Sequence, residues 1–376
     1  MSQLIVDIHT HVYPPSYMAM LRARKTVPYI HDPTDGSEPR LIILSSDDDP
    51  ATPLDQRGRP VDTSYSDINV KLTFMEKHGI NCSVISLANP WLDFVPSDEA
   101  QTWAERINDD LESTCAGVNK NKESKSLFAF GALPLSAPSE IVVGEIKRLT
   151  TLPHIRGVIM GTSGLGKGLD DPDLDPIWRA LKETQLVLFL HPHYGLPDEA
   201  FGGPEVINRY GHVLPLALGF PLETTIAVTR MLLSGVFDRF TKLQVLLAHS
   251  GGTLPFLAGR IESCILHERK FIANGGDTPG PQRSIWEVLQ TNIFLDAVIY
   301  GSAGLQAAVV AGSHDRLMFE GTDHPFFPPL HDEDEKWPSV TTNYRAIRSC
   351  FGDEKADSIG MVLGGNANRV LRLGLE

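Results

Sequence analysis

The stretch LIVDIHTH, residues 4–11, decides the fold class, because seven runs of the same kind follow it along the chain. Each run is short and apolar and lacks the apolar–polar alternation of a half-exposed strand, which is typical of parallel strands buried on both faces. The seven further runs are CSVISLA (82–88), LFAFGALPL (127–135), IRGVIMG (155–161), QLVLFLH (185–191), LQVLLAH (243–249), NIFLDAV (292–298) and RLMFEG (316–321). The sequence therefore predicts eight buried parallel strands.

Stretches with helical spacing lie between most of these runs, so helices are expected to connect the strands. These stretches cover residues 67–78, 97–118, 139–150, 173–184, 223–240 and 256–271. Eight strands that alternate with helices predict an α/β fold, a (β/α)8 TIM barrel. The alternative is an open, doubly wound sheet.

Two segments are too long for ordinary barrel loops. Residues 14–65 are polar and rich in Pro and Asp, and residues 195–221 contain the sequence FGGPEV. Long loops on an enzyme scaffold more often form lids or interface arms than linkers between domains. We therefore predict one barrel domain over residues 1–376, with both segments inserted over the carboxyl-terminal face.

The charge balance of the chain limits its partners. The 33 Lys and Arg residues against 47 Asp and Glu residues give a formal net charge of −14, which repels a phosphate backbone or an anionic bilayer. The four Cys residues are far apart and form no CxxC motif, which favours a reducing compartment. We expect a cytoplasmic enzyme that binds neither nucleic acid nor membrane and acts on a small molecule.

Residue types that bind metals end strand after strand. His9 and His11 alternate on the first strand, so both side chains can point into the barrel mouth. The carboxyl ends of barrel strands converge, so His191, His249 and Asp323 can face the same ion or a substrate on it. Imidazole and carboxylate ligands suit Zn²⁺, with Mn²⁺ possible.

Three longer motifs carry a family resemblance: the segment 219–261, EGTDHPF (320–326) and GGNANRVLRL (364–373). With the first-strand HTH they resemble the amidohydrolase superfamily, and within it the metal-dependent decarboxylases related to aminocarboxymuconate semialdehyde and γ-resorcylate decarboxylases. The resemblance implies that four side chains hold one divalent metal and that His249 is a polar catalytic partner. The implied ligands are His9, His11, His191 and Asp323. The fourth strand lacks the Lys that bridges two metals in many superfamily hydrolases, so one metal is expected.

Two further motifs narrow the resemblance. RGRPVDTSYSD (57–67) and SLANPWLDF (86–94) resemble the fungal isoorotate (5-carboxyuracil) decarboxylases of thymine salvage. This implies substrate contacts from Arg59, Asn89 and Phe326. Arg59 offers donors to a carboxylate or ring carbonyl, and the Asn89 amide can pair with an imide edge. The branch also implies a homodimer, with residues 14–65 long enough to reach a partner.

The metal is expected to replace an organic electron sink. A cation bound to the substrate carboxylate and a neighbouring ring oxygen favours protonation of the ring carbon, after which the C–C bond breaks. Asp323 or His249 supplies the proton, and the sequence leaves both open. Other possible substrates are an aminocarboxymuconate semialdehyde or a hydroxybenzoate. Other possible functions are hydrolysis of a lactone or cyclic amide, and a non-catalytic metal-binding scaffold.

Overall fold

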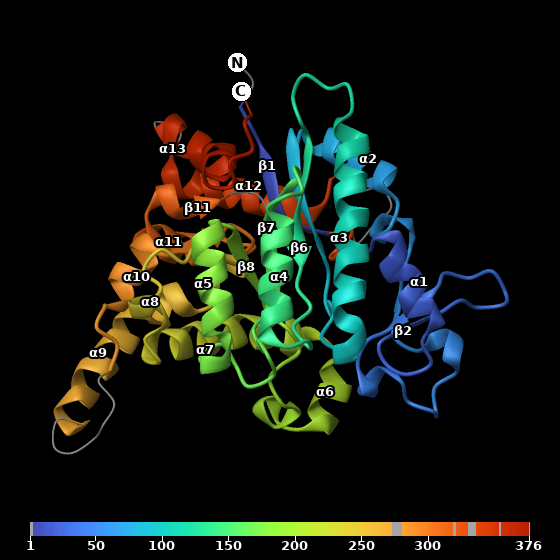
Figure 1. Cartoon of the computed structure of the whole chain (residues 1–376), viewed down its shortest axis with the longest axis horizontal. Helices are drawn as coiled ribbons and strands as arrows, with labels where there is room; N and C mark the ends of the chain where they lie inside the picture. The colour runs from blue at the N-terminus through green and yellow to red at the C-terminus, as the bar shows by residue number, and fades with distance from the viewer. Residues whose placement is uncertain (1–2, 273–279, 319–320, 330–335, 353–354, 376) are drawn as a thin grey trace.

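A computed structural model describes residues 3–272, 280–318, 321–329, 336–352 and 355–375 of the chain (Figure 1). Its centre is a parallel sheet with the strand order β11-β10-β9-β8-β7-β6-β5-β1-β12. The strands are β1 (Val6–Val12), β5 (Cys82–Leu87), β6 (Leu127–Ala132), β7 (Ile155–Gly161), β8 (Val187–His191), β9 (Val245–Leu247), β10 (Ile293–Asp296), β11 (Leu317–Met318) and β12 (Gly321–His324). Every strand of this sheet except β12 contributes buried apolar side chains to one continuous core.

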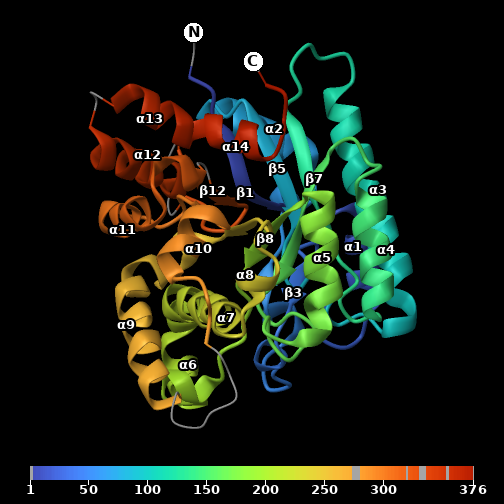
Figure 2. The same ribbon diagram turned by 60° about the vertical axis from the view of Figure 1, so that its left-hand side comes forward.

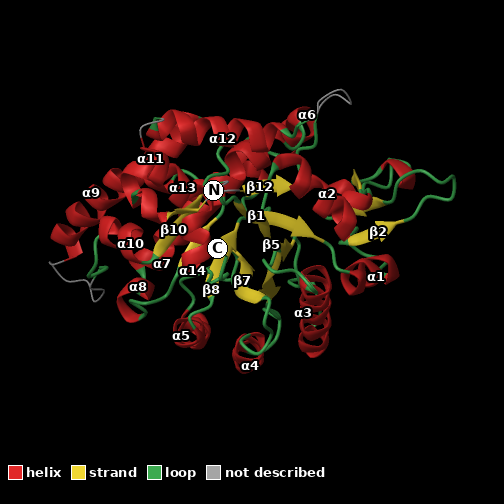
Figure 3. Ribbon diagram, turned by 90° about the horizontal axis from the view of Figure 1, so that it is seen from above, coloured by secondary structure: helices red, strands yellow, loops and turns green. Residues whose placement is uncertain are grey.

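The sheet closes into a barrel. Strands β11 and β12 stand at opposite ends of the strand order, yet only two residues separate them in the sequence, so the two ends of the sheet meet. Seen from above, the strands lie inside a ring of helices (Figure 3). The predicted (β/α)8 barrel is confirmed, and each of the eight apolar runs contains a strand. Phe319 and Glu320 of the last run lie outside the described residues.

Helices occupy all six expected stretches, and others follow in the last quarter of the chain. They are α2 (Ile68–His78), α3 (Ser97–Asn119), α4 (Ser139–Leu149), α5 (Asp175–Thr184), α7 (Phe220–Leu233), α8 (Val236–Arg239), α9 (Leu254–Ile272), α10 (Ile285–Thr291), α11 (Ser302–Gly312), α12 (Pro338–Phe351), α13 (Ala356–Gly360) and α14 (Asn366–Val370). Helix α2 begins where the Asp67 carboxylate accepts a hydrogen bond from the Asn69 N–H. The expected single helix over residues 223–240 is divided into α7 and α8, because Gly235 adopts a left-handed conformation with φ of 72°.

The segment 14–65 is more ordered than a long loop, which corrects the expectation. It contains α1 (Pro15–Ala23) and an antiparallel sheet of β2 (Tyr29–His31), β3 (Arg40–Ile42) and β4 (Arg59–Pro60). Leu21, Ile30 and Leu41 of this segment are buried in the main core, which gives the segment a reason to fold. The second insertion contains α6 (Pro204–Tyr210). Both β2 and α6 lie at the end of the barrel opposite the chain termini (Figure 1).

One helical stretch is long and apolar. Residues Pro215–Leu233 meet the length and composition of a membrane span, and half of this stretch is buried inside the structure. Met231 and Leu232 on its inner side are part of the barrel core.

Gly157 on β7 provides a test of the barrel packing. A Cβ at this position would lie 2.4 Å from the Val187 carbonyl oxygen and 2.8 Å from the Phe130 ring. We expect Gly157→Ala to lower the free energy of unfolding by ~1–3 kcal/mol through overpacking. Gly144→Ala in α4 is the control, because its Cβ would meet nothing within 4 Å and should stabilise the helix by ~0.5–1 kcal/mol. Thermal unfolding that ranks the two variants in the opposite order would contradict this packing.

Candidate metal centre and active site

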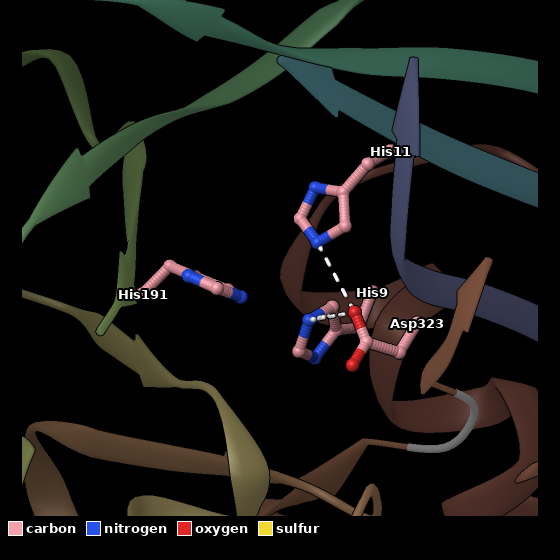
Figure 4. Close-up of side chains that lie close together, drawn as sticks. All are labelled: His9, His11, His191 and Asp323. Atoms are coloured by element: carbon pink, nitrogen blue, oxygen red, sulfur yellow. Dashed lines mark ion pairs between the residues drawn. The ribbon is translucent and has the colours of Figure 1, made fainter. Parts of the chain in front are cut away.

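Four side chains from three barrel strands converge at the carboxyl end of the sheet (Figure 4). His9 and His11 come from β1, His191 is the last residue of β8, and Asp323 comes from β12. All four are buried, and one ligand atom of each lies within 4.8 Å of the others. The sequence-predicted ligand set is thus brought together in one place.

The three imidazole rings surround a common point. The ring centroids of His9, His11 and His191 are 5.1 Å apart in every pair. Asp323 Oδ1 lies 3.5 Å from Nε2 of His9 and 3.5 Å from Nε2 of His11. His191 approaches from the opposite wall of the barrel (Figure 4). The arrangement offers three ring nitrogens and one carboxylate oxygen to a single ion.

The opposite nitrogen of each ring is held by the protein. Nδ1 of His9 bonds to Asp296 Oδ2 at 2.6 Å, and Nδ1 of His11 lies 3.0 Å from Ser86 Oγ. Nδ1 of His191 lies 2.8 Å from its neighbour's carbonyl oxygen. Bonds from Nδ1–H to oxygen acceptors leave a lone pair on each Nε2 and orient it, which is how proteins prepare imidazole as a metal ligand.

Two of these Nε2 atoms are buried without a hydrogen bond. Among the described residues, His9 Nε2 and His191 Nε2 have no hydrogen-bond partner. A buried polar atom without a partner costs free energy, so such atoms are rare in folded proteins. A metal ion would satisfy both atoms, and the donor set therefore fits a divalent cation of the Zn²⁺ or Mn²⁺ type.

Burial keeps the ring nitrogens available as ligands. Burial lowers the pKa of His11 to about 4 and holds the pKa of His191 well below its usual value, so both rings are neutral at pH 7. Burial alone would raise the pKa of Asp323, but the neighbouring imidazole rings lower it below its usual range. At His9 burial acts to lower the pKa, but the bond to Asp296 and the nearby carboxylates together outweigh it and the pKa is raised, so this ring gives up its proton when it binds a metal. Neutral imidazoles and an ionised carboxylate are the forms that bind metals.

Asp296, at the end of β10, was not identified from the sequence. Its buried carboxylate accepts the His9 ring bond and the backbone N–H groups of His249 at 2.9 Å and Ser250 at 2.7 Å. Asp296 therefore orients both the candidate ligand His9 and the backbone at His249 and Ser250. One signal in the sequence points to this residue. Asp296 lies near the end of the seventh apolar run, and the carboxylate and imidazole groups that end other runs lie at this site.

His249 lies beside the ligand set but is not part of it. Its ring centroid is 4.9 Å from that of His9 and 5.3 Å from that of His191. Its Nε2 is buried and has no hydrogen-bond partner within the described ranges. A ring nitrogen in this setting is available to a bound substrate.

The three expected substrate contacts surround the barrel mouth. Arg59 of β4 donates a hydrogen bond to the Tyr194 hydroxyl at 2.6 Å, which ties the first insertion to the chain after β8. Asn89 follows β5 and is 8% exposed, and its backbone carbonyl accepts a hydrogen bond from the Tyr13 hydroxyl at 3.0 Å. The Phe326 ring packs edge-on against His11, with centroids 5.7 Å apart. All three therefore lie at the end of the barrel that holds the four-residue cluster.

Tyrosine side chains that the sequence analysis missed connect these contacts. Tyr13 stacks on Tyr65 with centroids 5.7 Å apart, and Tyr65 packs edge-on against Phe326 at 5.6 Å. Burial raises the pKa of Tyr65 to about 12, so its hydroxyl stays protonated at pH 7. Aromatic residues in an insertion carry no periodic signal, which is why only the fold reveals this wall.

A buried carboxylate shapes the chain after His191. Glu223 of α7 accepts hydrogen bonds from the backbone N–H groups of His193 and Gly195, both at 2.9 Å. Nε2 of His193 faces the Asp93 carboxylate at 3.7 Å. Glu223 therefore holds the turn that presents both His191 and Tyr194 to the barrel mouth.

The fold and this cluster define a class: (β/α)8 barrels with a buried set of imidazole and carboxylate ligands at the carboxyl ends of the strands. The chain belongs to the amidohydrolase family, whose sequence model matches residues 120–373. The resemblance inferred from the motifs is confirmed.

Two relatives of known function are decarboxylases. The γ-resorcylate decarboxylase of Rhizobium radiobacter is 26% identical over 295 residues, which cover 77% of this chain and 85% of that protein. The 2-amino-3-carboxymuconate-6-semialdehyde decarboxylase of Dictyostelium discoideum is 26% identical over 71% of this chain and 69% of that protein.

Solved structures show the same fold. IDCase from Metarhizium anisopliae, crystallised in apo form, is 49% identical, has a TM-score of 0.89, and the match covers 99% of this chain and 98% of that one. The 5-carboxyvanillate decarboxylase of Novosphingobium aromaticivorans, crystallised with manganese, is 20% identical with a TM-score of 0.73 over 99% of this chain and 96% of that one. At that identity the second likeness concerns the fold alone.

The contact between His9 and Asp296 generates a prediction about metal affinity. We expect the wild type to bind about one equivalent of Zn²⁺ or Mn²⁺ and Asp296→Asn to bind it ~10–100-fold more weakly, because the acceptor that orients His9 is weakened. Asp175→Asn is the control, since Asp175 pairs with Arg239 on the outer surface. Competition with a chromophoric chelator gives both affinities. Equal affinities in the two variants would count against the role of Asp296.

Proposed function

We propose that this chain is a metal-dependent, non-oxidative decarboxylase that converts 5-carboxyuracil (isoorotate) to uracil in the cytoplasm, as a step of thymine salvage. The chain is a carboxy-lyase, as its relatives are decarboxylases. The observation that carries the proposal is the buried set of three ring nitrogens and one carboxylate at the barrel mouth. The substrate is supported by 49% identity to IDCase, an isoorotate decarboxylase, over 99% of this chain.

In this proposal His9, His11, His191 and Asp323 hold one divalent ion. Three nitrogen donors and one oxygen donor suit Zn²⁺, which we propose, and the same donors also accept Mn²⁺, which is the alternative. A bound ion supplies Lewis acidity, which orients the substrate oxygens and draws electrons from the ring. The sequence of β7 contains no Lys to bridge a second ion.

Arg59, Asn89 and Phe326 bind the substrate. The guanidinium of Arg59 uses one of its five N–H donors for Tyr194, and the remaining donors can serve a substrate carboxylate or carbonyl. Within the described part of the chain the Asn89 amide makes no side-chain hydrogen bond, so its donor and acceptor are free to pair with an imide. The Phe326 ring closes the site beside His11 and packs against a planar ring.

Decarboxylation replaces the carboxylate of the substrate by a hydrogen, so the ring carbon must gain one proton. Asp323 and His249 are the two groups in position to hold that proton. His249 has a buried ring nitrogen with no partner among the described residues, whereas Asp323 has a pKa below its usual range and is ionised before a substrate enters. We assign the proton transfer to this pair of residues.

Substrate choice tests the proposed function. We expect 5-carboxyuracil to be decarboxylated in preference to 2,6-dihydroxybenzoate, because a resorcylate ring has no imide and leaves the Asn89 amide unpaired. A buried unpaired polar group costs ~1–3 kcal/mol, which corresponds to a roughly tenfold to hundredfold difference in kcat/KM. Asn89→Ala should lose most of this preference.

The assay follows CO2 release and uracil formation with both substrates on the wild type and Asn89→Ala. A wild type that prefers the resorcylate would contradict the assigned substrate. Ring opening without CO2 release would instead favour the hydrolase that the sequence left open. Discrimination that is unchanged in Asn89→Ala would remove Asn89 from the site.

We further propose a homodimer. Residues 14–65 pack on their own barrel, but Leu218, Leu222 and Ile226 form an exposed apolar row along the π-helical turn η6 (Pro215–Gly219) and α7. Helices α7 and α9 contact each other and lie on one outer side of the molecule (Figure 2). Light scattering should give about twice the chain mass of 41.3 kDa for the wild type and a smaller mass for Leu222→Lys. A wild type of single-chain mass at micromolar concentration would exclude the dimer.

A further inference from the structure

Lys71 of α2 is completely buried beside the candidate metal centre. It is the only lysine or arginine among the buried side chains of the described residues. Removing an ammonium group from water is costly unless charged or hydrogen-bonding partners compensate for the lost hydration. A lysine at such a position therefore needs partners, and these partners indicate what it does.

The ammonium group touches the two strands that carry three of the four candidate ligands. Lys71 Nζ donates hydrogen bonds to Thr10 Oγ1 and to His324 Nδ1, the latter at 2.5 Å. Thr10 stands between His9 and His11 on β1. His324 directly follows Asp323 on β12, so one cation contacts the immediate neighbours of these ligands.

Backbone pairing between these strands is irregular at the same point. His9 pairs with Gly321 and Thr10 with His324, so the register shifts between successive residues of β1. Asp323, inside this shift, has φ of 52°. A regular ladder does not hold the two strands here, and side-chain contacts must keep the Asp323 carboxylate beside the histidine rings.

Lys71 also balances charge around the site. Asp7 and Asp296 are buried there together with Asp323, and Lys71 acts electrostatically on Asp7 and Asp323. Asp7 is further held by hydrogen bonds from Thr322 Oγ1 at 2.9 Å and from the His9 N–H at 3.3 Å. With all of these groups ionised, three carboxylates against one ammonium give a formal charge of −2, which one divalent cation would balance.

We propose that Lys71 is a positioning residue of the metal centre, which clamps β1 to β12 through Thr10 and His324 so that Asp323 meets the histidine ligands. The inference rests on the proposed function, because it assigns Lys71 a role toward the proposed metal. Lys71 touches neither metal nor substrate and acts only through its contacts with the two strands.

The test compares two pairs of variants. Lys71→Met removes the ammonium and nearly keeps the length of the side chain, whereas Lys77→Met is its control on the exposed side of the same helix. Thr10→Val removes the hydroxyl group but keeps the shape of the side chain, whereas Thr10→Ser keeps the hydroxyl group. The Thr10 pair keeps the proposal falsifiable if Lys71→Met does not fold.

The readout is transfer of Zn²⁺ from the loaded protein to a chromophoric chelator, with the thermal midpoint measured alongside. We expect Lys71→Met and Thr10→Val to bind Zn²⁺ about tenfold or more weakly than the wild type, and Lys77→Met and Thr10→Ser to bind it like the wild type. A purely structural lysine would lower the thermal midpoint and leave the Zn²⁺ affinity unchanged.

The outcomes separate this inference from the proposed function. Folded Lys71→Met and Thr10→Val proteins with wild-type Zn²⁺ affinity would overturn the role of Lys71 while the metal centre stands. A wild type that binds neither Zn²⁺ nor Mn²⁺ would overturn both.

Discussion

The site depends on one constraint: three imidazole rings must be buried around a single carboxylate, with one nitrogen of each ring turned toward it. Each ring uses Nδ1 for an oxygen acceptor of the protein and leaves Nε2 toward Asp323. The acceptors come from three different places in the barrel, namely Asp296, Ser86 and a backbone carbonyl. In water these rings would rotate freely. Inside the barrel the packing and the Nδ1 bonds hold the three Nε2 atoms around one point.

Strands of the barrel carry the candidate metal ligands, whereas the first insertion carries the candidate substrate contact Arg59. The candidate metal ligands are on β1, β8 and β12. Strand β1 pairs with β5 and β8 pairs with β7, whereas β12 pairs with β1 through a shifted register. Arg59, in contrast, belongs to the small sheet in the first insertion and reaches the site through Tyr194. A division of this kind lets a barrel keep its metal chemistry while the insertions set the substrate.

Buried charge is concentrated behind the site. Asp7 and Asp296 add negative charge close to Asp323, and Lys71 opposes part of it from the helix outside β1. Such an arrangement is costly without a compensating cation, because the barrel interior screens charge poorly. The same low polarity strengthens the attraction between a bound cation and its ligands.

The sequence by itself predicted the barrel and a group of convergent metal-binding residue types, from which the family resemblance selected the four candidate ligands. Both are local signals: the apolar runs mark buried strands, and alternation places His9 and His11 on one face, while His191 and Asp323 stand at strand ends. The folding of residues 14–65 and the roles of Asp296 and Lys71 came only from the tertiary structure. His9 and Asp296 are 287 positions apart, and Lys71 and His324 are 253 apart. No periodicity along the chain encodes such contacts, because they exist only once the strands have closed into a barrel.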